Sequence, residues 1–222
     1  MIGFYDYTVV LTYISLASSL IGIFCALSVQ PRWAIFFLAF SGLCDMFDGK
    51  IARTKKNRTE DEKNFGIQID SLCDVVCFGV FPIVICYKLG MTHIYSMVIL
   101  IFYGLAGLIR LAYFNVLEAK RQSESDEAGK FYRGLPITSM AIALPIFFVV
   151  SPLLPSQQIF MVILHILVAV IGILFITDFK LRKPTTIEVL ITVAVVFAAV
   201  VVIVFVWHEW WRLLRFGSLF KS

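Results

Sequence analysis

Charged residues are scarce in this chain: they make up only 15% of its 222 residues, whereas 60% are hydrophobic. A soluble domain of this size has about one quarter charged residues and slightly less than one half apolar ones. A chain this apolar could not cover its own surface in water. The composition therefore excludes a soluble protein and indicates that lipid surrounds most of the chain.

Histidine is also rare, and internal repeats, low-complexity tracts and a separate soluble domain are lacking. His93, His165 and His208 are scattered along the chain. No Ser, Cys or His is placed beside a general base that could activate it as a nucleophile. We therefore do not expect a covalent intermediate. The five cysteines all fall within apolar segments, where we interpret them as small apolar fillers.

Long apolar segments fill most of the chain. A helix needs about 20 apolar residues to cross a bilayer core of roughly 30 Å. The fold class expected is therefore all-α, a polytopic membrane helix bundle. We predict spans at residues 7–27, 33–52, 66–89, 94–117, 135–153, 159–176 and 187–207.

Basic residues cluster in alternate loops, and such loops stay on the cytoplasmic side of a membrane. They lie after the second, fourth and sixth spans, while the turns near Gly90 and Pro155 are nearly uncharged. The pattern predicts a cytoplasmic N-terminus. The seventh span would leave Arg212 and Arg215 outside, so the tail could instead lie along the interface as an amphipathic segment.

Acidic residues cluster at two neighbouring span ends, where ionisable groups are costly and indicate function. Asp45 and Asp48 are three residues apart near the end of the second span. Asp70 and Asp74 are four apart near the start of the third, on one stripe of a helix. Because the two helices are antiparallel, with residues 54–65 as their loop, all four carboxylates should lie at one depth near the cytoplasm.

Four close carboxylates repel one another unless they are neutralised. Oxygen ligands suit Mg²⁺ or Mn²⁺, and two such ions about 4 Å apart can clamp a phosphoryl group during in-line displacement. Small residues at Gly49, Ala52 and Gly66 leave room beside these carboxylates. Taken singly, an acid could pair with an arginine and a glycine could serve helix packing, but together the set favours a two-metal site.

The run Asp45-x2-Asp48-Gly49-x2-Ala52-Arg53, followed by Gly66-x3-Asp70-x3-Asp74, resembles the signature of the CDP-alcohol phosphotransferase family. The gap between Arg53 and Gly66 is longer than the commonest form of the motif. The flanks resemble the phosphatidylserine synthase branch, through residues 70–82, 110–115 and 131–136.

The resemblance implies a six-helix membrane core, here residues 1–183, which typically dimerises. Residues 184–222 would add a C-terminal transmembrane or interfacial helix and the amphipathic tail. Asp45, Asp48, Asp70 and Asp74 should hold two metals, with Asp74 also the general base. Asp74 lies deepest on its stripe, which agrees with that role. The residues implied for binding the CDP-lipid are Gly49, Ala52, Arg53 and Gly66.

The implied reaction joins CDP-diacylglycerol and L-serine into phosphatidylserine and CMP, in the cytoplasmic membrane. Nucleic acid is not an expected partner. Arg110, Lys130 and Arg133 could bind a phosphate or the serine carboxylate. Alternatively, Arg110 could form an ion pair with Asp45 or another acid, while Lys130 and Arg133 could simply belong to a basic cytoplasmic loop.

Two other functions are compatible with parts of this pattern. Another acceptor, such as glycerol 3-phosphate, an inositol phosphate or choline, would need a denser basic pocket or an aromatic cage. A cation transporter could also line its path with four aspartates. Transporters usually place such acids near the midplane, often with repeats and broken helices, whereas these acids lie at span ends among glycine and arginine. The positions therefore favour phosphate chemistry.

Overall fold

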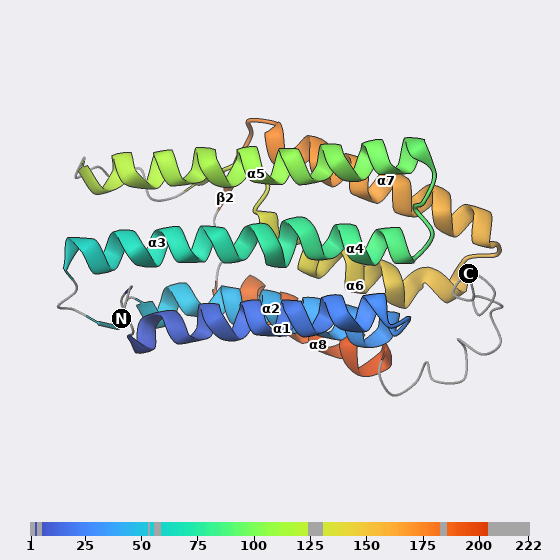
Figure 1. Ribbon diagram of the computed structural model, residues 1–222, viewed down its shortest axis with the longest axis horizontal. Helices are drawn as coiled ribbons and strands as arrows, with labels where there is room; N and C mark the ends of the chain where they lie inside the picture. Colours follow the sequence, from blue (N-terminus) through green and yellow to red (C-terminus); the bar gives the residue numbers. More distant parts are fainter. Residues whose placement is uncertain are drawn as a thin grey trace.

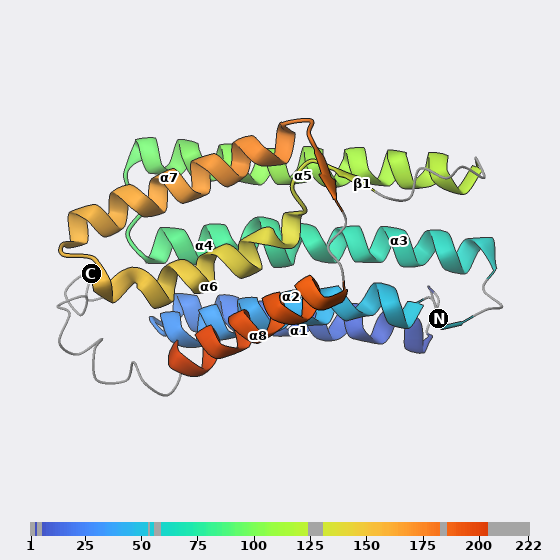
Figure 2. The same cartoon turned by 180° about the vertical axis from the view of Figure 1, so that it is seen from behind.

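The computed structural model describes residues 3, 6–52, 54–55, 59–123, 131–182 and 186–203. These residues form a bundle of long helices that run side by side (Figures 1 and 2), which confirms the expected all-α class. The helices are α1 (Tyr7–Leu27), α2 (Pro31–Ala52), α3 (Glu60–Asp74), α4 (Phe81–Lys88), α5 (Ile94–Ser123), α6 (Met140–Val150), α7 (Gln157–Ile176) and α8 (Thr186–Val201).

Four helical segments are long and apolar enough to cross a membrane, within the described part of the chain. They are Tyr7–Leu27, Glu60–Lys88, Ile94–Leu117 and Gln157–Ile176. The second expected span, α2, is of similar length but carries Asp45 and Asp48 in its last third. The expected spans around α6 and α8 correspond to the shorter apolar segments Ile137–Leu153 and Ile191–Val201.

The third span differs from the prediction at its start. The chain is helical from Glu60, so the expected loop of residues 54–65 is shorter and Gly66 lies inside α3. A capping box explains the early start: the Thr59 hydroxyl accepts a hydrogen bond from the Glu62 amide, and the Glu62 carboxylate accepts one from the Thr59 amide. Three acidic residues in the first turn also favour this helix end.

Helices α3 and α4 form one continuous rod (Figure 1), joined by a π-helical segment at Val75–Val80. An α-helix would pair the Phe78 carbonyl with the amide of residue 82, but Pro82 has none. The Tyr103 hydroxyl of α5 donates to that carbonyl instead, at 2.5 Å, and both side chains are buried. A neighbouring helix thus supplies a hydrogen-bond donor where the proline removes one.

Helix α1 packs along α2 and also contacts α3 and α4, while α5 packs along α7. Helix α6 lies against α2, and α8 contacts both of these helices. In Figure 2, α8 passes in front of α2. The approach of α2 to α6 is close at Gly42, where an added Cβ would lie 2.6 Å from the Ala141 Cβ. Between α5 and α7, the Ser96 hydroxyl and His165 Nε2 are 2.7 Å apart.

Two short strands, β1 (Phe131–Arg133) and β2 (Lys180–Arg182), pair antiparallel beside the helices. This pairing was not predicted, because strands of three residues are too short to show a recognisable period. The Gly134 amide donates to the Phe179 carbonyl at 2.8 Å. Gly134 has φ +71°, and an added Cβ would be 3.2 Å from the Thr177 carbonyl oxygen, so this turn requires glycine.

Candidate active site

Aspartates of α2 and α3 meet where the two antiparallel helices lie beside each other. Oxygens of Asp45, Asp70 and Asp74 all lie within 4.8 Å of one another. Asp48 lies about one helical turn after Asp45 on α2 and is buried, with 7% of its surface exposed. The structure therefore brings all four predicted acids together, with three of them in one compact cluster.

The carboxylates contact one another in pairs. Asp48 lies within hydrogen-bonding reach of Asp70, and Asp45 within reach of Asp74. One oxygen of Asp70, Oδ1, is buried and has no hydrogen-bond partner among the described residues. Two carboxylates at such a distance need a proton or a cation between them, because their like charges repel in a poorly solvated place.

The donor set fits a hard divalent cation. Its oxygens all come from carboxylates, which Mg²⁺ and Mn²⁺ prefer over nitrogen or sulfur ligands. The unpaired Oδ1 of Asp70 offers a buried acceptor with no other use in the described structure. This aspartate cluster could therefore bind a metal ion.

The small residues of the signature lie on the same two helices. Gly49 is exposed and follows Asp48 directly, while Gly66 is half-buried one turn before Asp70. Ala52 ends α2. Arg53 lies outside the described residues. Because neither Gly49 nor Gly66 has a side chain, each helix presents only its backbone at these two positions.

Arg110 of α5 is buried, with 6% of its surface exposed. Its Nε donates to the Leu135 carbonyl at 3.0 Å, and its guanidinium lies over the Phe114 ring. The structure shows no ion pair between Arg110 and any described acid, which argues against the alternative of a partner such as Asp45. Its Nη1 is buried and unpaired, so the guanidinium keeps a donor for an anion.

Two other basic residues, Arg133 and Lys130, were predicted from the sequence as anion ligands. Arg133 lies in β1, where its backbone pairs with Lys180. Lys130 lies outside the described residues. Gly134 follows Arg133. A Cβ added to Gly134 would lie 3.5 Å from Nε of Arg110. The turn after β1 therefore lies directly beside the Arg110 guanidinium.

Two polar contacts to residues of the signature were not predicted from the sequence. The Thr12 hydroxyl of α1 donates to Asp48 Oδ2 at 3.2 Å. The Ser71 hydroxyl donates to Asn115 Oδ1 of α5 at 2.9 Å, next to Asp70. Neither could be found from the motif, because Thr12 and Asn115 lie on helices outside it. In contrast, the Thr59-x-x-Glu62 pattern is a local signal that could have located the start of α3.

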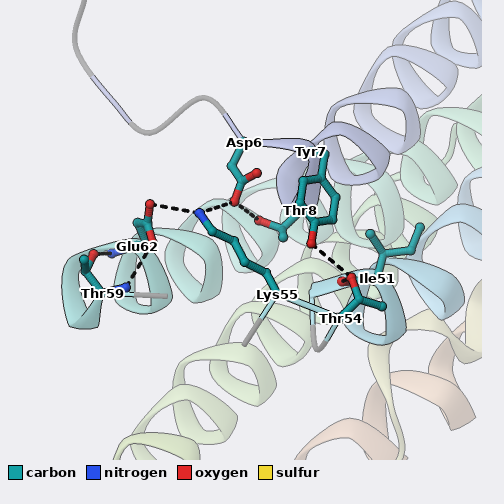
Figure 3. A network of polar contacts seen from close by, with 8 residues as sticks. All are labelled: Asp6, Tyr7, Thr8, Ile51, Thr54, Lys55, Thr59 and Glu62. Carbon is teal, nitrogen blue, oxygen red and sulfur yellow. Dashed lines mark hydrogen bonds and ion pairs between the residues drawn. The ribbon is translucent and has the colours of Figure 1, made fainter. Parts of the chain in front are cut away.

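A polar network ties the start of α1 to the connection between α2 and α3 (Figure 3). The Lys55 ammonium contacts the Asp6 carboxylate at 2.7 Å and the Glu62 carboxylate at 3.1 Å. The Tyr7 and Thr54 hydroxyls are 3.2 Å apart. The Lys55 ammonium lowers the pKa of Asp6, and the two carboxylates raise the pKa of Lys55. These contacts hold the first three helices together at the end that carries the aspartates.

A profile of the CDP-alcohol phosphatidyltransferase family matches residues 8–174. Among curated proteins, the chain is 39% identical over 111 residues to the CDP-diacylglycerol–serine O-phosphatidyltransferase of Saccharomyces cerevisiae, covering 49% of this chain and 39% of that protein. It is 33% identical over 136 residues to the Helicobacter pylori (strain 26695) protein of the same name, covering 58% of this chain and 51% of that protein.

A third relative is the archaetidylserine synthase of Methanothermobacter thermautotrophicus, 30% identical over 139 residues, with 62% of this chain and 55% of that protein covered. The chain thus spans about half the length of the curated relatives it matches, or less. The profile match includes α1 through most of α7 and every aspartate of the cluster. With its long apolar helices and its aspartate signature, this chain is an integral membrane protein of the CDP-alcohol phosphatidyltransferase family.

Proposed function

We propose that this chain transfers the phosphatidyl group of CDP-diacylglycerol to the hydroxyl of L-serine, giving phosphatidylserine and CMP. The observation that carries the proposal is the meeting of Asp45, Asp70 and Asp74 on two antiparallel helices of a member of this family. The names of its bacterial, yeast and archaeal relatives support serine as the acceptor.

Two divalent cations, Mg²⁺ or Mn²⁺, are the proposed cofactors, held by Asp45, Asp48, Asp70 and Asp74. When bound, such ions would offset the negative charge of a diphosphate and stabilise the charge that develops during displacement. The paired carboxylates and the unpaired Asp70 Oδ1 support this assignment. The four aspartates come from two helices of one bundle, which supports their acting as a shared set of ligands.

Asp74 is the proposed general base. Its carboxylate accepts the proton of the serine hydroxyl while that oxygen attacks the β-phosphorus of CDP-diacylglycerol. A new phosphorus–oxygen bond to serine forms as the bond to the CMP phosphate breaks. CMP leaves with the bonding electron pair, and Asp74 later releases the proton to water.

The CDP moiety would lie against Gly49, Ala52, Arg53 and Gly66. The small residues Gly49, Ala52 and Gly66 allow a bulky ligand to approach the backbone, and the guanidinium of Arg53 would suit the phosphates of the ligand. Gly49 is exposed beside the aspartates, which supports this placement. The cytoplasm is the proposed side, because the connection between α2 and α3 is rich in lysine and arginine.

Arg110 would bind the serine carboxylate or a phosphate, with Lys130 and Arg133 adding positive charge nearby. The buried, unpaired Nη1 supports an anionic ligand. Arg110→Gln separates the two ligands by kinetics. A higher KM for L-serine alone would assign Arg110 to the acceptor, whereas a higher KM for CDP-diacylglycerol would assign it to the phosphates.

The proposed arrangement has a catalytic core of residues 1–183 and a C-terminal addition of residues 184–222. Helix α8 packs on α2 and α6, and the family profile ends at residue 174, before it. A homodimer in the membrane is the proposed assembly. Crosslinking in lipid nanodiscs would test the dimer, and deletion of residues 184–222 would test whether the core acts alone.

The decisive experiment supplies the purified protein in detergent with CDP-diacylglycerol and Mn²⁺ or Mg²⁺, and follows CMP release. The acceptors are L-serine, glycerol 3-phosphate, inositol, inositol phosphate and choline, and Asp45→Asn serves as the inactive control. We expect L-serine to give the fastest release, with phosphatidylserine identified by mass spectrometry.

A clear preference for another alcohol would contradict the serine assignment but keep the reaction class. No CMP release with any acceptor, together with cation flux in vesicles free of CDP-lipid, would favour the transporter alternative.

A further inference from the structure

The hydroxyl of Thr12 contacts the aspartate site from outside the signature. Thr12 lies on α1, and its Oγ1 donates to Asp48 Oδ2 at 3.2 Å. Both side chains are buried, with 5% of Thr12 and 7% of Asp48 exposed. A hydrogen bond to an ionised group in such a place is shielded from competing water.

This contact restrains a torsion that is otherwise loose. The last torsion of an aspartate side chain is broad, so its carboxylate can rotate unless something holds it. Asp48 accepts a hydrogen bond from Thr12 at Oδ2 and also lies within hydrogen-bonding reach of Asp70. Because α1 packs against both α2 and α3, the Thr12 hydroxyl is fixed relative to both helices that carry the aspartates.

The three buried serines of α1 make contacts of a different kind. Ser15 and Ser19 contact the Ser41 hydroxyl at 2.8 Å each, and Ser18 donates to the Phe37 carbonyl at 3.2 Å. These bonds join α1 to α2 without involving a described carboxylate. They are the interhelical hydrogen bonds common in membrane proteins, and they provide a matched comparison for Thr12.

We propose that Thr12 is a positioning residue of this site, which orients the Asp48 carboxylate for binding a divalent cation. The inference rests on the proposed function, since it assumes that the aspartates hold a cation. Partners that orient metal ligands are typically worth about 10- to 100-fold in metal affinity. Thr12 would act through Asp48 and would not itself contact the cation or the substrate.

The test measures Mn²⁺ binding to the full chain in detergent by electron paramagnetic resonance, without substrate. Thr12→Val keeps the shape of the side chain and removes the hydroxyl, so we expect Mn²⁺ affinity to fall about 10- to 100-fold. Thr12→Ser restores the hydroxyl and should bind within about threefold of wild type on the same basis. Ser18→Ala removes an α1–α2 hydrogen bond of similar kind and should leave Mn²⁺ affinity unchanged.

Two further measurements separate positioning from general packing. In an Asp48→Asn background, Thr12→Val should cause no additional loss of Mn²⁺ affinity, because the carboxylate that it orients is gone. Thr12→Ala replaces Thr12→Val if the latter does not fold, with the same expected loss.

Wild-type affinity in a folded Thr12→Val or Thr12→Ala variant would overturn the role of Thr12, as would an equal loss in Ser18→Ala. A wild-type protein that binds no Mn²⁺ would instead overturn the proposed cation site, and this role with it, while CMP release tests the transfer reaction separately.

Discussion

Replacing Asp74 by asparagine should remove the proposed base while leaving the site assembled. Asp74 lies within hydrogen-bonding reach of Asp45. An asparagine amide has the same size and can donate to the Asp45 carboxylate, so the contact between α2 and α3 should persist. We therefore expect Asp74→Asn to fold, to keep at least one cation and to bind CDP-diacylglycerol.

The expected loss is in turnover. General-base assistance is worth about 10²- to 10⁴-fold in rate, or about 2.7 to 5.4 kcal/mol of activation free energy. Asp70→Asn provides the matched comparison, because Asp70 Oδ1 is buried and unpaired and is thus available to a cation. That variant should lose cation and CDP-diacylglycerol binding as well as turnover, since a bound metal would connect the protein to the diphosphate.

The assay compares three quantities for both variants: the rate of CMP release, the affinity for CDP-diacylglycerol and the affinity for Mn²⁺. Ser71→Ala, which loses only the hydrogen bond to Asn115, serves as a control for disturbance of α3. If Asp74→Asn and Asp70→Asn lost substrate binding equally, Asp74 would be chiefly a metal ligand. Another group or water would then accept the serine proton.

Three other perturbations have defined outcomes. EDTA should abolish CMP release and added Mn²⁺ should restore it; full activity in chelator would refute the metal-dependent mechanism. Tyr103→Phe should lower the free energy of unfolding by about 1–3 kcal/mol, because it removes the buried hydrogen bond from the Tyr103 hydroxyl to the Phe78 carbonyl. Tyr87→Phe at an exposed position should change the free energy of unfolding little. Asp6→Asn should lower the Tm at neutral pH. Because Lys55 lowers the pKa of Asp6 in the folded protein, this stabilisation is present above the unfolded pKa of about 3.9 and is lost as the pH falls through the lower folded value. The Tm difference between Asp6→Asn and wild type should therefore shrink in acid, and a difference that persisted there would contradict the role of the ion pair.

Helix periodicity made the clustering of the four aspartates predictable. Spacings of three and four residues place Asp45 beside Asp48 and Asp70 beside Asp74 on single helix faces, whatever surrounds them. The short connection after α2 requires the next helix to run antiparallel, so the two pairs had to come close. The apolar composition likewise required helices, because a chain in lipid must satisfy its backbone hydrogen bonds internally.

Contacts between helices distant in the sequence were decided only by tertiary packing. Periodicity assigns Thr12 to a face of α1 but does not say that this face meets Asp48. Nor does it say that Tyr103 replaces the amide that Pro82 lacks, or that Arg110 donates to the Leu135 carbonyl and not to an acid. The sequence by itself therefore determined the helices and the aspartate cluster, since both depend on short-range spacing. The partners that orient the cluster depend on which helix faces meet, and side-chain packing across the whole bundle sets this.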